Sequence, residues 1–154
     1  MKKYLLPTSS FLLLLTSMAV ANVQITNLQD YQFGEIDLHN INAVNHPLCI
    51  YNSDSTSNSY LVQIYSNAAG GKYVMTNGIS QLPYSIKWSP VAAGGAGYQA
   101  LSPNIPLHMD NASNELNCGG RDDANMEISV NPTELSGVTA GSYSTTLNIV
   151  ISPV

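Results

Sequence analysis

Residues 137–154, GVTAGSYSTTLNIVISPV, carry the pattern that decides the fold of this chain. The turn-forming residues Ala140-Gly141-Ser142 come first. Four apolar residues then fall on one face of an extended strand: Tyr143, Leu147, Ile149 and Ile151. Polar residues alternate with them, and Pro153 ends the pairing because proline has no N–H to donate. This period of two predicts a half-buried strand, and such a strand needs a neighbour to pair with.

Short strand patterns separated by turns fill the rest of the chain. They cover residues 23–28, 31–38, 47–51, 59–66, 72–76, 79–88, 98–101 and 124–131. Residues 59–66 are apolar on both faces, which is typical of a strand at the centre of a sheet. Asn77-Gly78 predicts a tight hairpin with positive φ at both residues, whereas the polar residues 40–46 predict a loop.

This series of strands predicts the fold class. Seven or eight short strands, with turns at regular spacing and almost no helix pattern, are typical of an all-β, immunoglobulin-like antiparallel β-sandwich. The single tryptophan, Trp88, shares a strand face with Tyr84 and Ile86 and is expected in its core. The pattern leaves the order of the strands open.

The N-terminus has the three parts of a secretory signal peptide. Lys2 and Lys3 form a positive region, an apolar stretch follows, and Ala19-Val20-Ala21 matches a cleavage site. We therefore expect residues 1–21 to be a signal peptide and residues 22–154 to be a single exported domain. No stretch of residues 22–154 is apolar over the length that a bilayer requires.

The charge balance bears on the partners. Residues 22–154 hold three basic residues, Lys72, Lys87 and Arg121, against ten acidic ones. Such an acidic domain is a poor match for nucleic acid or for an anionic membrane surface.

Cys49 and Cys118 are the only two cysteines. An even pair in an exported chain predicts one disulfide, which on the chain-entropy model contributes about 4 kcal/mol. A metal site is the alternative, but no Cys-x-x-Cys or His-x-x-x-His spacing occurs, so we expect no bound metal.

Catalytic patterns are also absent from the sequence. The candidate acids and bases are His39, His46, His108, Asp110, Asp122 and Asp123. No Gly-x-Ser-x-Gly, phosphate loop or calcium-loop spacing places them together. We therefore expect a protein that is not an enzyme, with no catalytic residues and no cofactor. A tyrosine patch for a ligand is possible at Tyr60, Tyr65, Tyr73 and Tyr84, but core packing explains such residues more simply.

Several short stretches resemble the spore coat U-like subunits of bacterial chaperone–usher pili. They are Phe33-Gly34, Cys49-Ile50-Tyr51, LPYSIKW at residues 82–88, and AGSYSTTL at residues 140–147 before the ending VISP. The last of these is the most specific. The pieces are spread over nearly the whole of residues 22–154.

The resemblance implies a structural pilus subunit with a role in adhesion or biofilm formation. Subunits of that family resemble immunoglobulin sandwiches that lack a final strand, which a periplasmic chaperone and then another subunit supplies. The implied partners are therefore a periplasmic chaperone, an outer-membrane usher and other pilus subunits, and the implied location is the periplasm and then the cell surface.

Two groups of residues acquire expected roles from this resemblance. Tyr143, Leu147, Ile149 and Ile151 would form the strand that pairs with the chaperone or a neighbouring subunit. Val23, Ile25 and Leu28 would be a possible donor strand, although residues 22–29 are a short extension for that purpose. The alternative is a self-contained secreted binding domain or tip adhesin that recognises a carbohydrate or another surface ligand.

Overall fold

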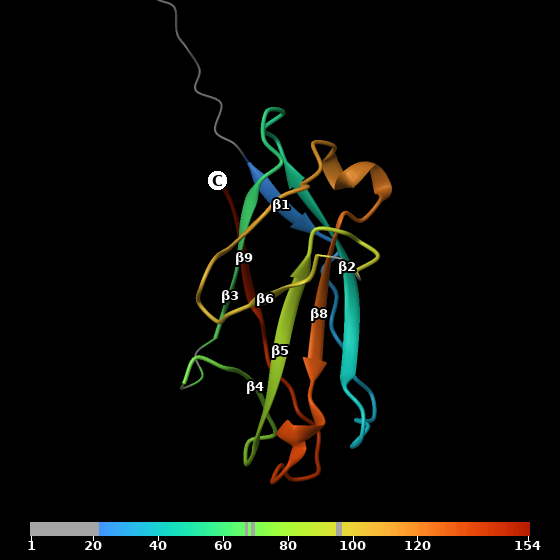
Figure 1. Cartoon of the computed structure of the whole chain (residues 1–154), viewed down its shortest axis with the longest axis vertical. Helices are drawn as coiled ribbons and strands as arrows, with labels where there is room; N and C mark the ends of the chain where they lie inside the picture. Colours follow the sequence, from blue (N-terminus) through green and yellow to red (C-terminus); the bar gives the residue numbers. More distant parts are fainter. Residues whose placement is uncertain (1–21, 67, 69, 95–96) are drawn as a thin grey trace, which may run out of the picture.

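The computed structural model describes residues 22–154 except 67, 69 and 95–96, and these residues form two antiparallel sheets (Figure 1). The predicted signal peptide lies outside the described residues. The larger sheet has the order β1-β2-β8-β5-β4, with β6 paired to β5, and the smaller sheet has the order β7-β3-β9. The elements are β1 (Val23–Thr26), β2 (Asn42–Asn52), β3 (Tyr60–Tyr65), β4 (Tyr73–Thr76), β5 (Gln81–Ser89), β6 (Gln99–Leu101), β7 (Leu107–Met109), the 3₁₀ turn η1 (Leu116–Gly120), β8 (Ala124–Val130), the 3₁₀ turn η2 (Pro132–Leu135) and β9 (Asn148–Pro153).

The strand order is that of an immunoglobulin-like sandwich, which confirms the predicted fold class. The sequence β1-β2-β8-β5 repeats the A-B-E-D sheet of that fold, and β3-β9 repeats its C-F pair. The strands β6 and β7 lie in the long connection between D and E. In this correspondence β9 is strand F, whose second neighbour in a complete sandwich is strand G.

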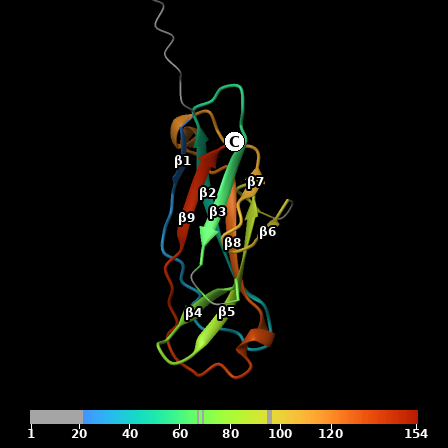
Figure 2. The same ribbon diagram turned by 90° about the vertical axis from the view of Figure 1, so that its left-hand side faces the viewer.

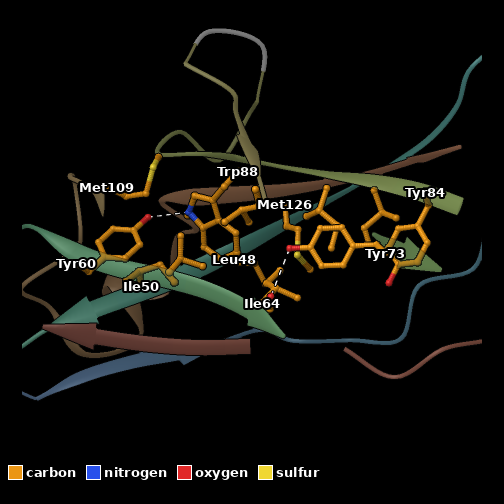
Figure 3. Packing of buried hydrophobic residues seen from close by; sticks show 14 of the residues in the cluster. Leu48, Ile50, Tyr60, Ile64, Tyr73, Tyr84, Trp88, Met109 and Met126 are labelled. Carbon is orange, nitrogen blue, oxygen red and sulfur yellow. Dashed lines mark hydrogen bonds between the residues drawn. The ribbon is translucent and has the colours of Figure 1, made fainter. Parts of the chain in front are cut away.

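The core lies between the two sheets and contains the predicted tryptophan (Figure 3). Trp88 is fully buried, and its indole Nε1–H donates to the Tyr60 hydroxyl across the sandwich, 2.9 Å away. Tyr73 and Tyr84 stack on each other at the other end of the cluster, with ring centroids 5.6 Å apart. The hydrogen bond between Trp88 and Tyr60 matters because an indole or phenol group that is buried without a polar partner is costly.

The predicted disulfide is present and joins the two halves of the chain. Cys49 in β2 and Cys118 in η1 have Cα atoms 5.8 Å apart. Beside them, Asp123 accepts hydrogen bonds from two backbone N–H groups, Ile50 at 2.8 Å and Ser113 at 2.9 Å. Burial raises the pKa of the Asp123 carboxyl above its usual value, although these two hydrogen bonds oppose the effect.

Several local predictions need correction. Residues 31–38 form no strand, although their sequence is strand-like. Residues 42–46, expected in a loop, belong to β2 because they pair with β8. Asn77-Gly78 forms the predicted hairpin between β4 and β5, but the connection has four residues, 77–80, and of the pair only Gly78 has a positive φ, of 88°. The Asn77 side chain caps this turn by accepting from the N–H groups of Ile79 and Ser80.

Candidate functional site

An elongated groove of about 1020 Å³ opens along one side of the sandwich. Its two walls are residues 28–36 (except 35) and residues 141–150, which are far apart in the sequence. Figure 2 shows the chain that follows β1 and the chain that precedes β9 descending along the same side of the molecule. Its floor is the inner face of the larger sheet, formed by Met75, Leu82, Tyr84, Met126 and Ile128.

The floor is apolar and belongs to the core. Met126 is fully buried, and Leu82 and Ile128 are 3% and 4% exposed. Tyr84 contributes its ring, and burial raises the pKa of its hydroxyl to about 12. A groove whose base is the core of the protein is suited to apolar side chains rather than to a polar substrate.

The wall 141–150 passes from one sheet to the other. Ser144 exchanges two backbone hydrogen bonds with Thr76 at the edge of β4, and Asn148 then pairs with Tyr65 of β3. Regular pairing therefore begins at Asn148, so the strand is shorter than the alternation from Tyr143 predicts. Within the described chain, β9 pairs with β3 on one side only, and its residues 148–150 line the groove.

A tyrosine corner holds the start of this wall. The Tyr143 hydroxyl donates to the Thr139 carbonyl, 2.6 Å away and four residues upstream. Asn77 Nδ2 donates to Thr139 Oγ1 at 3.2 Å, which ties the corner to the hairpin between β4 and β5. In immunoglobulin-like sandwiches this tyrosine stands near the start of strand F, so the corner independently identifies β9 as that strand.

The opposite wall, residues 28–36, belongs to no strand. Tyr31 packs on the ring of His46, with centroids 4.9 Å apart, and burial raises the pKa of the Tyr31 hydroxyl. That hydroxyl and Thr26 Oγ1 are buried without a hydrogen-bond partner in the described structure. A strand-like sequence that lacks a ladder, beside the free edge of β9, leaves room for one further strand between them.

The structure separates the residues that the sequence groups together. Tyr143, Leu147 and Ile149 line the groove, whereas Ile151 is half-buried in β9 beyond the groove. Val23 and Ile25 lie in β1, paired with β2, and only Leu28 of the possible donor residues lines the groove. Neither the floor nor the role of residues 28–36 as a wall is recognisable in the sequence, since both depend on contacts between distant segments.

The other candidate residues form no common site. His39 is exposed, His46 packs on Tyr31, and His108 lies in β7. In the residues that the structure describes, no group of three His, Cys, Asp or Glu side chains could hold a metal ion. No helix in the same residues is long and apolar enough to cross a membrane. Of the four tyrosines considered as a ligand patch, Tyr60, Tyr73 and Tyr84 lie in the core and Tyr65 is 43% exposed.

Comparisons with known proteins support the fold. A scan against protein-family models and a search of curated proteins found no match. A search of solved structures found a chain from a structure described as a chaperone–tip adhesin complex vital for synergistic activation of CFA/I fimbriae biogenesis. The TM-score is 0.64 at 14% sequence identity, over 86% of this chain and 42% of that chain. This chain thus spans less than half the length of its neighbour, and the fold that the two share is one found in a fimbrial assembly complex.

Proposed function

We propose that this chain is a non-catalytic subunit of a surface pilus whose groove is filled by a strand from another protein. A periplasmic chaperone supplies that strand first, and a neighbouring subunit replaces it in the fibre with the help of an outer-membrane usher. The subunit belongs to the spore coat U-like class, and its role is in adhesion or biofilm formation.

The free edge of β9 is the observation that carries this proposal. The tyrosine corner supports β9 as strand F, and the position of strand G beside it is the groove. An incoming strand there gains main-chain hydrogen bonds from β9 and places alternate side chains on Met126, Ile128 and Leu82. Among the described residues, the lining holds one carboxylate, Asp30, and neither histidine nor cysteine, a composition in keeping with a binding groove.

A second candidate is a tip adhesin or self-contained binding domain that recognises a carbohydrate or another surface ligand. The structural neighbour comes from a complex that is described as containing a tip adhesin, and this description supports retaining the adhesin as a second candidate. The two candidates differ in one physical property. An unfilled groove leaves an unpaired strand edge and the exposed wall residue Leu28 open to solvent, and both favour aggregation, whereas a complete domain has no such unpaired edge.

Co-expression in the periplasm tests the proposal. The mature chain is produced alone and together with candidate periplasmic chaperones, and each extract is analysed by size-exclusion chromatography. We expect degradation or aggregation of the chain alone and a stable one-to-one complex with its chaperone. A soluble, monomeric chain that binds no chaperone would favour the self-contained domain.

A further inference from the structure

We propose that β1 is a resident strand, meaning a permanent part of this chain's own sandwich, and is not the strand that the chain gives to a neighbour. The chain then accepts a strand in its groove without offering residues 22–26 in return. This inference rests on the proposed function. It adds that the groove of this chain accepts a strand, whereas β1 does not serve as the donated one.

The backbone of β1 is already paired along its length. Val23, Gln24, Ile25 and Thr26 stand opposite Asn52, Tyr51, Ile50 and Cys49 in an antiparallel register. The pairing continues one residue further, where Asn22 N–H donates to Ser53 Oγ at 2.8 Å and Ser53 N–H donates to the Asn22 carbonyl at 3.0 Å. A donated strand needs a free backbone, so β1 would first have to leave β2.

The side chains of β1 are also in use. Val23 and Ile25 are partly buried against the core, and β1 lies beside β9 (Figure 2). Cys49 and Ile50, directly opposite β1, are fully buried. Release of β1 would therefore open the edge of β2 beside the disulfide and expose part of the core to water.

A fixed turn separates β1 from the groove. Asn27 has a φ of 66°, and its Nδ2 donates to Asp122 Oδ1 at 2.6 Å. The Asn27 carbonyl accepts from His46 Nε2–H at 2.7 Å. The lining of the groove begins at the next residue, Leu28. The possible donor segment is thus divided by this turn into a resident strand and the first residue of the accepting wall.

A disulfide between β1 and β2 tests the inference directly. Gln24 and Tyr51 stand opposite each other, and opposite residues of an antiparallel pair are within reach of a disulfide. The variant Gln24→Cys/Tyr51→Cys locks the strand, and Gln24→Ser/Tyr51→Ser is its matched control. We expect mass spectrometry of the purified chain to find the 24–51 bridge beside the native 49–118 bridge. Failure of the new bridge to form under oxidising conditions would overturn the assignment of β1.

Assembly in cells then distinguishes the two roles. Each variant replaces the native chain, and sheared surface fibres are probed with an antibody against the chain. The amount of the locked variant in the fibres should be within twofold of the amount of its matched control, because a resident strand does not need to move. A loss of tenfold or more in the locked variant alone would mean that β1 is donated.

A groove variant keeps this inference separate from the proposed function. Leu147→Arg places a charge in the accepting wall and should be lost from the fibres. If Leu147→Arg assembles like the native chain, the proposed function has failed. If Leu147→Arg and the locked variant are both lost while the Ser control assembles, only the inference about β1 has failed.

Discussion

Ser144 and Thr76 exchange two backbone hydrogen bonds, of 3.0 and 3.1 Å, at the point where the C-terminal wall of the groove leaves the larger sheet. Four residues later, Asn148 pairs with Tyr65 of the smaller sheet. The wall is therefore anchored to a different sheet at each end. Its position depends on these two pairings and on the tyrosine corner, and each can be tested separately.

The tyrosine corner contributes measurable stability. Tyr143→Phe removes the hydrogen bond to the Thr139 carbonyl and should lower the free energy of unfolding by about 1 kcal/mol, measured by urea denaturation of the protein with its groove filled by a strand. The matched control is Tyr65→Phe. The Tyr65 hydroxyl contacts Gln63 at the surface, so its removal should change the free energy of unfolding little. An equal effect of the two changes would contradict the corner as the anchor of the wall.

Two neighbouring positions in β9 test the orientation of the strand. Ile149 is half-buried and lines the groove, so Ile149→Asp should lower stability by about 2 kcal/mol or more and abolish co-purification with the chaperone. Asn148→Asp adds the same charge at an exposed position and should leave co-purification intact. Equal damage from both changes, measured by pull-down and periplasmic yield, would mean that the strand is covered on both faces.

The disulfide should contribute a large share of the stability of the chain. Cys49→Ser/Cys118→Ser removes the bridge between β2 and η1 and is expected to cost about 4 kcal/mol, with a large fall in periplasmic yield. Thermal melting of the variant beside the native chain, with and without reductant, gives the measurement. The reductant should lower the melting temperature of the native chain only, and an unchanged melting temperature in the double variant would contradict a stabilising bridge.

Asp123 should make stability depend on pH. Its pKa is raised in the folded chain, so between the unfolded and folded pKa values the folded state binds more protons than the unfolded state. The free energy of unfolding should therefore fall as pH rises through this window, and it should stay lower at neutral pH. Asp123→Asn should remove this component, so the difference between the two stability profiles isolates it. A native profile that runs parallel to that of Asp123→Asn would contradict the raised pKa.

The strands that carry their own pairing signal could be predicted from the sequence. Residues 124–131 alternate clearly and form β8. Residues 59–66, which are apolar on both faces, form β3, and β3 lies at the centre of its sheet as expected. The disulfide followed from the number of cysteines and the predicted export. Residues 31–38 also have a strand-like pattern but form no strand in the structure, and no local feature of their sequence indicates this.

The groove itself could not be predicted from local pattern. Leu28 and Leu147 line opposite walls, and no property of either residue indicates the other. The floor adds Met75, Leu82 and Met126 from three further strands. The resemblance of residues 140–147 to a pilus subunit indicated a missing strand, but its location required the order of the sheets.

The pairing of β3 with β9 also has a consequence for the time course of folding. Tyr60 pairs with Pro153 and Ile64 pairs with Ile149, so the smaller sheet is held together by contacts between distant parts of the chain. Such a high contact order predicts slow folding. β9 is the last described strand along the chain, so one edge of β3 from Tyr60 to Tyr65 stays unpaired until β9 has been synthesised. If the chain is exported as proposed, this edge of β3 is the last part of the smaller sheet to be completed, and it stays open to pairing or aggregation throughout synthesis and transport.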